Sequence, residues 1–155
     1  MGLGQDEERQ MFHKILLATG GSPWSNNALG WALRLAASLH TDLLIVHIFE
    51  DDPPFQPQGT PSTDPQFKEQ IEASGQRILA QAAQRAAQEH LACRIVSQWG
   101  SIPEHIVQLA STEQCDLIVM GTRHLIGEKR LMTGRICNTV IATAQCPVLV
   151  VPFIQ

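Results

Sequence analysis

The chain of 155 residues is 44% hydrophobic and 17% charged. This composition suits a domain with one buried core, and the chain is short for two domains. A formal net charge of -4 and a sequence pI near 5.8 argue against nonspecific binding to DNA or RNA. Residues 1–10 are polar, and no run approaches the roughly 18–20 apolar residues of a membrane-spanning helix. We therefore expect a flexible N-terminal tail at residues 1–10 and one cytoplasmic domain at residues 11–155, with no membrane or nucleic-acid partner.

The first part of the chain predicts a strand, a helix and a second strand. Residues 13–19 form a short apolar run that stops at two glycines, as a buried parallel strand does. Ser22 and Pro23 then provide the start of a helix that should reach residue 39. The stripe expected to be buried comprises Leu29, Leu33, Ala36 and Ala37. Residues 41–49 are the most continuous apolar run and predict a central strand.

A proline-rich segment separates this unit from the next helix. Five prolines between residues 53 and 65 exclude helix and interior strand, so residues 50–66 are interpreted as a mobile loop. Residues 66–90 are rich in Ala, Gln, Glu and Arg and predict a long amphipathic helix. Its apolar side comprises Phe67, Ile71, Ile78, Leu79, Ala82 and Ala86. Residues 93–99 alternate only in part, which predicts a strand near a sheet edge.

The last third of the chain repeats the alternation. Ser101 and Glu104 match a capping box at the start of a helix. Residues 116–120 predict a strand, and residues 136–144 predict a helix. The buried face expected for that helix comprises Ile136, Val140, Ile141 and Ala144. Residues 146–152 predict a final strand at a sheet edge, with prolines only at its ends.

This order of strands and helices predicts a single-domain α/β fold. Because each crossover between parallel strands is right-handed, five strands should form a Rossmann-like, doubly wound parallel sheet with helices on both faces. In such sheets ligands bind where the strand order reverses, which here lies between the strands at residues 13–19 and 116–120. The glycines that follow these two strands should therefore face each other.

The segment of residues 121–134 joins the fourth strand to the last helix and is cationic. Four of the chain's 11 Lys and Arg residues lie in or directly after it, and they are Arg123, Lys129, Arg130 and Arg135. A glycine-containing loop before a helix N-terminus favours anions, so this composition indicates a phosphate-bearing ligand. The alternative interpretation is a solvated loop whose charges only oppose aggregation.

The remaining reactive side chains give no catalytic or metal pattern. The cysteines occur singly in apolar surroundings, and we interpret Cys93, Cys115, Cys137 and Cys146 as reduced core residues. The six histidines lack the spacings of zinc sites, so we expect no metal. His47, inside the apolar run of residues 41–49, is interpreted as a hydrogen-bonded structural residue. No triad or carboxylate pair indicates an enzyme.

Four segments together resemble the universal stress protein family, and the likeness extends over nearly all of residues 12–152. They are residues 14–23, 43–47, 118–123 and 146–151. ATP-binding members of that family carry a glycine, two residues, a glycine, nine residues, and then a glycine followed by Ser or Thr. Gly121 and Gly134 match this motif, but His124 replaces its second glycine and Arg135 replaces its hydroxyl residue. Gly20 stands where the family usually has an aspartate.

The resemblance implies a stress-response or regulatory binding module rather than an enzyme, although slow incidental ATP hydrolysis is compatible with it. In one interpretation, Arg135 and His124 supply the missing donors, and the altered loop holds ATP, with Mg²⁺, or another adenine nucleotide. In the other, Arg135 fills the phosphate space and the chain is a scaffold that binds no nucleotide. A third alternative is an ATP pyrophosphatase-like enzyme, because residues 19–22 resemble that phosphate loop, although Trp24 replaces its acid.

If a nucleotide binds, the resemblance places its contacts at the ends of three strands. Phosphates would meet Gly121, Arg123, Gly134 and Arg135, the nucleoside would meet Thr19 and Gly20, and adenine would pack on Ile48. The other residues expected to contact the cofactor are Ala18, His124 and Ile136. The resemblance also implies a homodimer that pairs through the C-terminal strand at residues 148–151, and a protein partner that the sequence does not identify.

Overall fold

The computed structural model describes residues 11–50, 64–123 and 134–153. Strands and helices alternate along the chain, as the sequence predicts. In order they are β1 (Lys14–Ala18), α2 (Pro23–Leu39), β2 (Asp42–Glu50), α3 (Pro65–Gln88), β3 (Cys93–Gly100), α4 (Ile102–Thr112), β4 (Leu117–Arg123), α5 (Arg135–Thr143) and β5 (Val148–Phe153). Within these ranges, no helix is long and apolar enough to cross a membrane.

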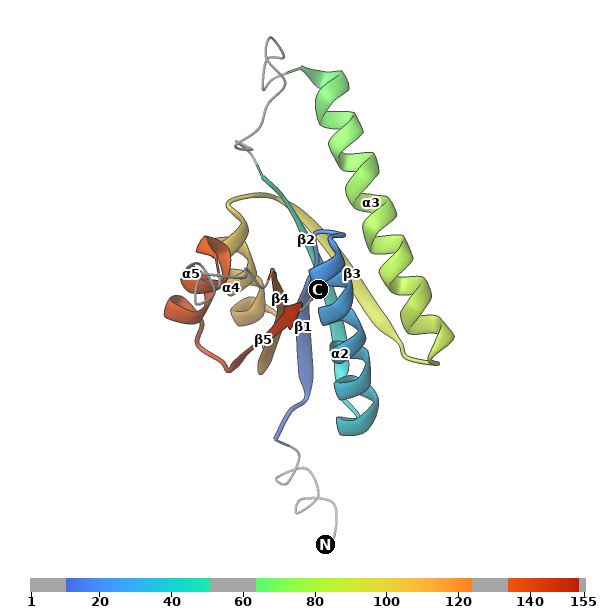
Figure 1. Ribbon diagram of the computed structural model, residues 1–155, viewed down its shortest axis with the longest axis vertical. Helices are drawn as coiled ribbons and strands as arrows, with labels where there is room; N and C mark the ends of the chain where they lie inside the picture. Colours follow the sequence, from blue (N-terminus) through green and yellow to red (C-terminus); the bar gives the residue numbers. More distant parts are fainter. Residues whose placement is uncertain (1–10, 51–63, 124–133, 154–155) are drawn as a thin grey trace, which may run out of the picture.

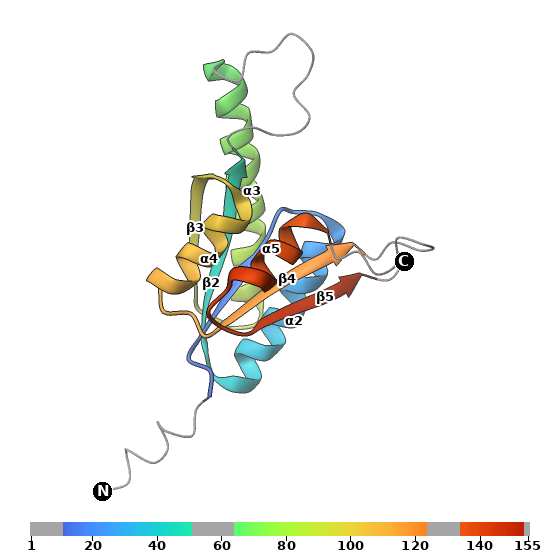
Figure 2. The same ribbon diagram turned by 90° about the vertical axis from the view of Figure 1, so that its left-hand side faces the viewer.

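The five strands form one parallel sheet in the order β3-β2-β1-β4-β5. Helices α2 and α3 cover one face, and α4 and α5 cover the other (Figures 1 and 2). This is the predicted doubly wound α/β fold, with β3 and β5 at the two edges. The middle position belongs to β1, while β2, predicted as central, lies between β1 and β3. The strand order reverses between β1 and β4.

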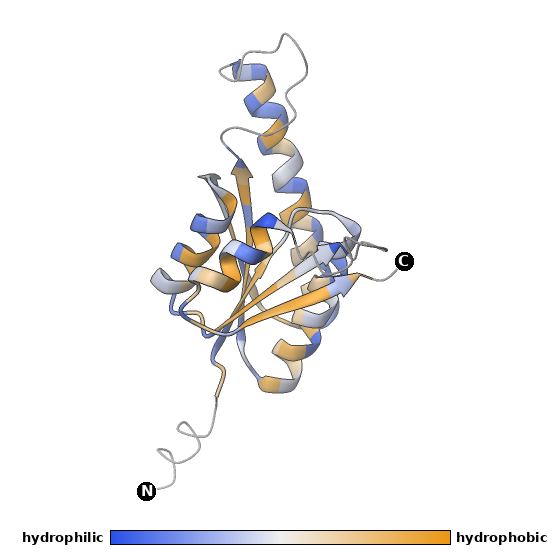
Figure 3. Cartoon of the chain, turned by 60° about the vertical axis from the view of Figure 1, so that its left-hand side comes forward, coloured by the Kyte–Doolittle hydropathy of each residue, from blue (hydrophilic) through white to orange (hydrophobic). Residues whose placement is uncertain are grey.

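Each face of the sheet has its own apolar core. On β1, Ile15 and Leu17 pack toward α2 and α3, whereas Leu16 packs toward α4 and α5, and all three are fully buried. This alternation follows from the two-residue period of a strand, and it explains why β1 reads as a continuous apolar run. Figure 3 shows the result, since the strands are mostly hydrophobic and the helices alternate between hydrophobic and hydrophilic surfaces.

The start of α2 forms as predicted. Ser22 is the N-cap, its hydroxyl accepts a hydrogen bond from the Ser25 backbone N–H, and Pro23 occupies the first helical position. The helix ends at His40, whose φ of 54° is left-handed. Ala37, expected in the buried stripe, is exposed because that stripe continues through Ala32 and Ala36.

The predicted loop of residues 50–66 is too long at both ends. Glu50 is the last residue of β2, and α3 already begins at Pro65. The Asp64 side chain caps α3 by accepting from the Gln66 N–H, and Pro65 occupies the first helical position. Asp64 and Pro65 therefore mark the start of the helix, although the proline content of the segment had indicated a loop. The mobility expected for residues 51–63 lies outside the described residues, as does the tail of residues 1–10.

Two further predictions about helices are right only in part, since Ser101 does begin α4 and Val140 is buried as expected. Ser101 occupies the N-cap position of α4, but its hydroxyl donates to the Glu104 carboxylate and makes no capping bond to a backbone N–H. On α5, Ile136 is 37% exposed and Ile141 is 50% exposed, because the residues that face the sheet are Cys137 and Val140. The predicted face was wrong by about one position because it left out Cys137, which is a core residue.

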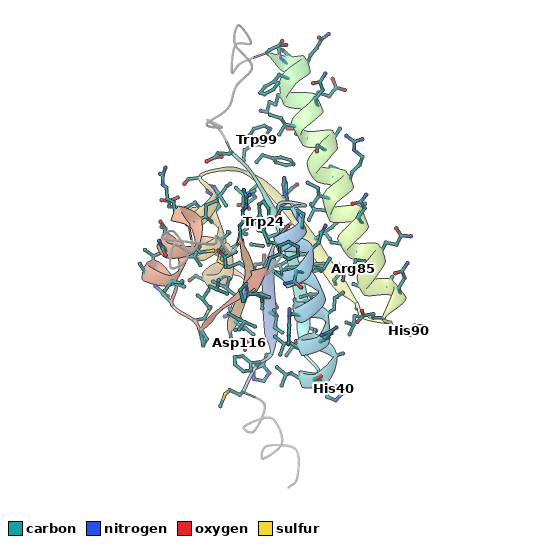
Figure 4. The ribbon with its side chains drawn as sticks, viewed as in Figure 1. Trp24, His40, Arg85, His90, Trp99 and Asp116 are labelled. Carbon is teal, nitrogen blue, oxygen red and sulfur yellow. The ribbon has the colours of Figure 1, made fainter. Side chains whose placement is uncertain are left out.

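The cysteines are all free thiols, as expected. Burial raises the pKa of each, and that of Cys115 most clearly, to about 11. They therefore stay protonated near neutral pH and act as small apolar residues. Asp116, near the lower end of β4 in Figure 4, accepts from the backbone N–H groups of His13 (2.7 Å) and Lys14 (3.1 Å), which ties the starts of β1 and β4 together.

Candidate nucleotide-binding cavity

A cavity of about 690 Å³ lies at the carboxyl ends of β1, β2 and β4, where the strand order reverses. Its walls also include the first residues of α2, α4 and α5. This is the place at which open parallel sheets bind ligands, and the volume lies in the range of small-molecule sites. The cavity therefore has the position and size expected for a cofactor or nucleotide.

The end of β1 forms one wall and is held by hydrogen bonds. The Thr19 N–H donates to the Val46 oxygen at 2.9 Å, and Nδ1 of His47 lies 2.7 Å from the Thr19 oxygen. The Thr19 hydroxyl donates to Ser25 Oγ at 3.4 Å and accepts from the Gly21 N–H at 3.3 Å. These bonds fix the wall, and they pair the N–H, the backbone oxygen and the hydroxyl of Thr19 with other protein groups. His47 is thus the hydrogen-bonded structural residue that the sequence predicts.

The floor of the cavity is apolar. Ile48 of β2, Ile106 of α4 and Met120 of β4 line it, and each is less than 10% exposed. These side chains belong to the core between the sheet and the α4–α5 layer. A flat, largely apolar ring can pack on such a surface and lose its contact with water.

The opposite side of the cavity is cationic. Arg123 ends β4 and Arg135 begins α5, and both side chains are exposed. The Arg123 guanidinium lies 5.8 Å from the centroid of the Trp24 ring, and Figure 4 shows Trp24 at the upper end of α2, where that helix begins. The ion pairs in the described ranges include neither arginine. Both guanidinium groups can therefore approach an anion from solvent.

Arg135 acts against the dipole of α5, and a nearby acid offsets part of this cost. Glu104, in the first turn of α4, has a lowered pKa, mainly because Ser101 donates a hydrogen bond to it, and then through its own backbone N–H. Attraction to Arg135 contributes further to this lowering. No ion pair joins the two side chains in the described part of the chain, so within it the Arg135 guanidinium can still donate hydrogen bonds to a ligand.

Three helices begin at this cavity. Ser22 and Trp24 belong to the start of α2, Ser101 and Ile102 to that of α4, and the Gly134 N-cap to that of α5. The first backbone N–H groups of a helix lack acceptors within the helix and carry partial positive charge. Three such ends add to the two arginines, so the cavity attracts anions.

The two motif glycines are required by the backbone, each for its own reason. A Cβ on Gly121 would overlap the Trp24 backbone oxygen and lie 2.7 Å from the Trp24 carbonyl carbon, so glycine lets β4 approach α2. Gly134 has φ 89° and ψ 160°, a region that other residues rarely adopt. In the structure, therefore, Gly121 serves helix packing as well as the cavity wall.

The site residues named from the sequence converge on this one cavity. Those in the described ranges that line it are Ala18, Thr19, Gly20, Ile48, Gly121, Arg123, Gly134, Arg135 and Ile136. His124 lies outside the described residues. The sequence analysis missed the wall contributed by α4 and by Glu50 at the end of β2. The rule that parallel strands end at the same sheet edge could have found Glu50.

No cluster of three or more His, Cys, Asp or Glu side chains suited to a metal ion occurs in residues 11–50, 64–123 and 134–153. Ser101, which lines the cavity, donates its hydroxyl hydrogen bond to the Glu104 carboxylate. Ser22 and Ser25 bond to each other at 3.0 Å, and their remaining contacts are to the helix backbone and to Thr19.

Comparison with known proteins agrees with this geometry. The model of the universal stress protein family matches residues 11–152. A universal stress protein of Thermus aquaticus is 34% identical over 141 residues, which cover 91% of this chain and 99% of the relative. The universal stress protein YxiE of Bacillus subtilis is 28% identical over 147 residues, with 91% and 99% covered.

Solved structures share the fold. A universal stress protein in complex with cAMP has a TM-score of 0.70 at 22% identity, covering 91% of this chain and 97% of its own. The universal stress protein of Archaeoglobus fulgidus in complex with dAMP has a TM-score of 0.67 at 17% identity, and the match covers 90% of this chain and 98% of that protein. A universal stress protein family protein from Arabidopsis thaliana with AMP bound has a TM-score of 0.66 at 17% identity, and the match covers 90% of this chain and 91% of that protein. With a family match across nearly its whole length, this chain belongs to the universal stress protein family.

Proposed function

We propose that this protein is a regulatory binding module of the stress response whose cavity takes up an adenine nucleotide. The observation that carries the proposal is the division of one cavity into an apolar floor around Ile48 and a cationic side at Arg123 and Arg135. A nucleotide has the same division, with a flat base at one end and phosphate at the other. Three structural relatives bind cAMP, dAMP and AMP, which supports the choice of adenine.

Arg135 takes the role of the hydroxyl residue in the family's motif. Its side chain is exposed at the start of α5, and the described residues leave a cavity of about 690 Å³ beside it. This favours a phosphate ligand over a side chain that fills the phosphate space. A guanidinium can bind phosphate through two hydrogen bonds, and the free helix N–H groups add further donors.

Isothermal titration with ATP, ADP and AMP, with and without Mg²⁺, tests the proposal. We expect saturable one-site binding by the wild type and a roughly 10- to 100-fold loss of affinity in Arg135→Ser, because a charge-assisted hydrogen bond is removed. Arg94→Ser is the matched control, since Arg94 is also an exposed cation, pairs with Glu113 and does not line the cavity. No heat of binding from the wild type, with binding restored in Arg135→Ser, would support the scaffold alternative instead.

We also propose that two copies pair through the β5 edge. Leu149 on β5 is 38% exposed, and Ile141 on the adjacent helix α5 is 50% exposed. An edge strand with apolar side chains is a template for a second strand. Sedimentation should show a dimer that Leu149→Lys disrupts. Ile95→Lys, at the 44% exposed position on the opposite edge strand β3, should leave the dimer intact. A wild-type monomer at micromolar concentration would contradict this pairing.

A further inference from the structure

Glu50 is the one acidic residue among the described residues that line the cavity. It ends β2 and follows Leu44, Val46 and Ile48 at two-residue intervals. These three apolar side chains all belong to the core between the sheet and the α4–α5 layer. Because side chains alternate along a strand, Glu50 lies on the same face as Ile48 and one step farther toward the mouth of the cavity.

The Glu50 backbone is held and its carboxylate is available. Its Cα pairs in register with Gly100 of β3, so the end of β2 is part of the sheet and not a loose loop. The residue is partly buried, and within the described ranges its side chain has no hydrogen bond or ion pair. An acceptor held at the rim of a cavity can meet a ligand that donates hydrogen bonds.

The order of the strands determines which part of a bound nucleotide the Glu50 carboxylate would meet. The cations lie on β4 and α5, Gly20 follows β1, and Glu50 lies on β2, with β1 between β4 and β2. Neighbouring strands are about 4.8 Å apart, so Glu50 and the cationic side are separated by about two strand spacings. Phosphate at Arg135 therefore puts the sugar over the end of β1, where the described residues leave open space at Gly20, and the base over β2.

We propose that Glu50 accepts a hydrogen bond from the 6-amino group of the bound adenine and so selects this base. The inference rests on the proposed nucleotide-binding function. Ile48 then packs on the ring, and Glu50, one step farther out, lies at the ring edge. A carboxylate accepts from an amino group, whereas a 6-oxo group at the same place would bring two acceptors together.

The test compares AMP with purine ribonucleoside 5′-monophosphate, which lacks only the 6-amino group. The wild type should bind AMP about tenfold more tightly than the analogue. In Glu50→Met, which removes the acceptor and keeps the side-chain length, this preference should fall to nearly one. Glu50→Gln retains a neutral acceptor oxygen and should show an intermediate preference. Melting curves monitored by circular dichroism establish that both variants are folded.

Glu104→Gln is the charge control, because it removes an acid near Arg135 that does not line the cavity. It should alter the affinity for AMP and the analogue equally. If Glu50 acted only through its charge, Glu50→Met and Glu50→Gln would both strengthen binding of both anions and leave the preference unchanged. That result would overturn the inference. The inference would also be overturned if the Glu50 variants changed only the preference for AMP over dAMP, because these two ligands differ in the sugar and not in the base. Failure of the wild type to bind AMP at all would refute the proposed function as well.

Discussion

The Nδ1 atom of His47 lies 2.7 Å from the backbone oxygen of Thr19, and because that oxygen can only accept, the imidazole donates. This bond joins β2 to the residue that follows β1, at the wall of the cavity. The same ring meets Phe49 edge to face at 5.0 Å. Gly75 of α3 lets the helix approach this ring, since a Cβ there would lie 2.8 Å from His47 Cδ2.

Replacing His47 with leucine should lower the free energy of unfolding by about 1–3 kcal/mol, because the Thr19 oxygen loses its donor. Urea denaturation measures this change. His13→Leu is the control, because the His13 side chain is exposed and its backbone alone bonds to Asp116, so a change within about 0.5 kcal/mol is expected. Equal effects of the two substitutions would show that the bond contributes nothing to stability.

Gly121 and Gly20 provide a matched pair of substitutions in the same cavity wall. An added methyl group on Gly121 overlaps the backbone of Trp24, whereas one on Gly20 has no described residue within 4 Å. We expect Gly121→Ala to destabilise the protein by about 1–3 kcal/mol through displacement of β4 from α2, and Gly20→Ala to change stability by less than about 0.5 kcal/mol. Thermal and urea denaturation of both variants would reveal the difference. A stable Gly121→Ala protein would show that glycine is retained there for ligand binding alone.

These two glycines show what the sequence could and could not predict. The topology followed from short apolar runs that alternate with amphipathic helices, because buried parallel strands and helices have different lengths and periods. The convergence of residues 18–20, 48, 121–123 and 134–136 followed from the same topology, because parallel strands end at one edge. The close approach of Gly121 to Trp24 could not be predicted, since it depends on where α2 crosses β4.

The errors also have physical causes. The pattern predicts a buried face of Ile136, Val140, Ile141 and Ala144 on α5, but Ile136 and Ile141 are exposed and Cys137 is buried. Hydropathy alone does not distinguish a side chain that faces the sheet from one that faces solvent when both kinds are apolar. The bond from Ser101 to Glu104 likewise replaced the expected backbone cap, because a nearby carboxylate competes for the same hydroxyl.

The ion pair between Arg94 and Glu113, 2.9 Å apart, should give stability a measurable pH dependence. The hydrogen bond from Arg94, and then its charge, lower the pKa of Glu113 below the ordinary value of 4.5. Because the pKa is lower in the folded state, the stabilisation is present above the unfolded-state pKa and is lost as pH falls through the folded value. Glu113→Gln should therefore have a lower melting temperature than the wild type at pH 7, and this difference should disappear toward pH 3. A difference independent of pH would mean that the substitution acts through packing and not through charge.

The central claim is that the cavity at the ends of β1, β2 and β4 binds an adenine nucleotide with its phosphate at the start of α5. A crystal structure of the protein grown with AMP tests this most directly. The account predicts density for the nucleotide in the cavity, with phosphate oxygens within hydrogen-bond distance of Arg135 and the base packed on Ile48. An empty cavity with the Arg135 side chain folded into it, at AMP concentrations that saturate a micromolar site, would contradict the account.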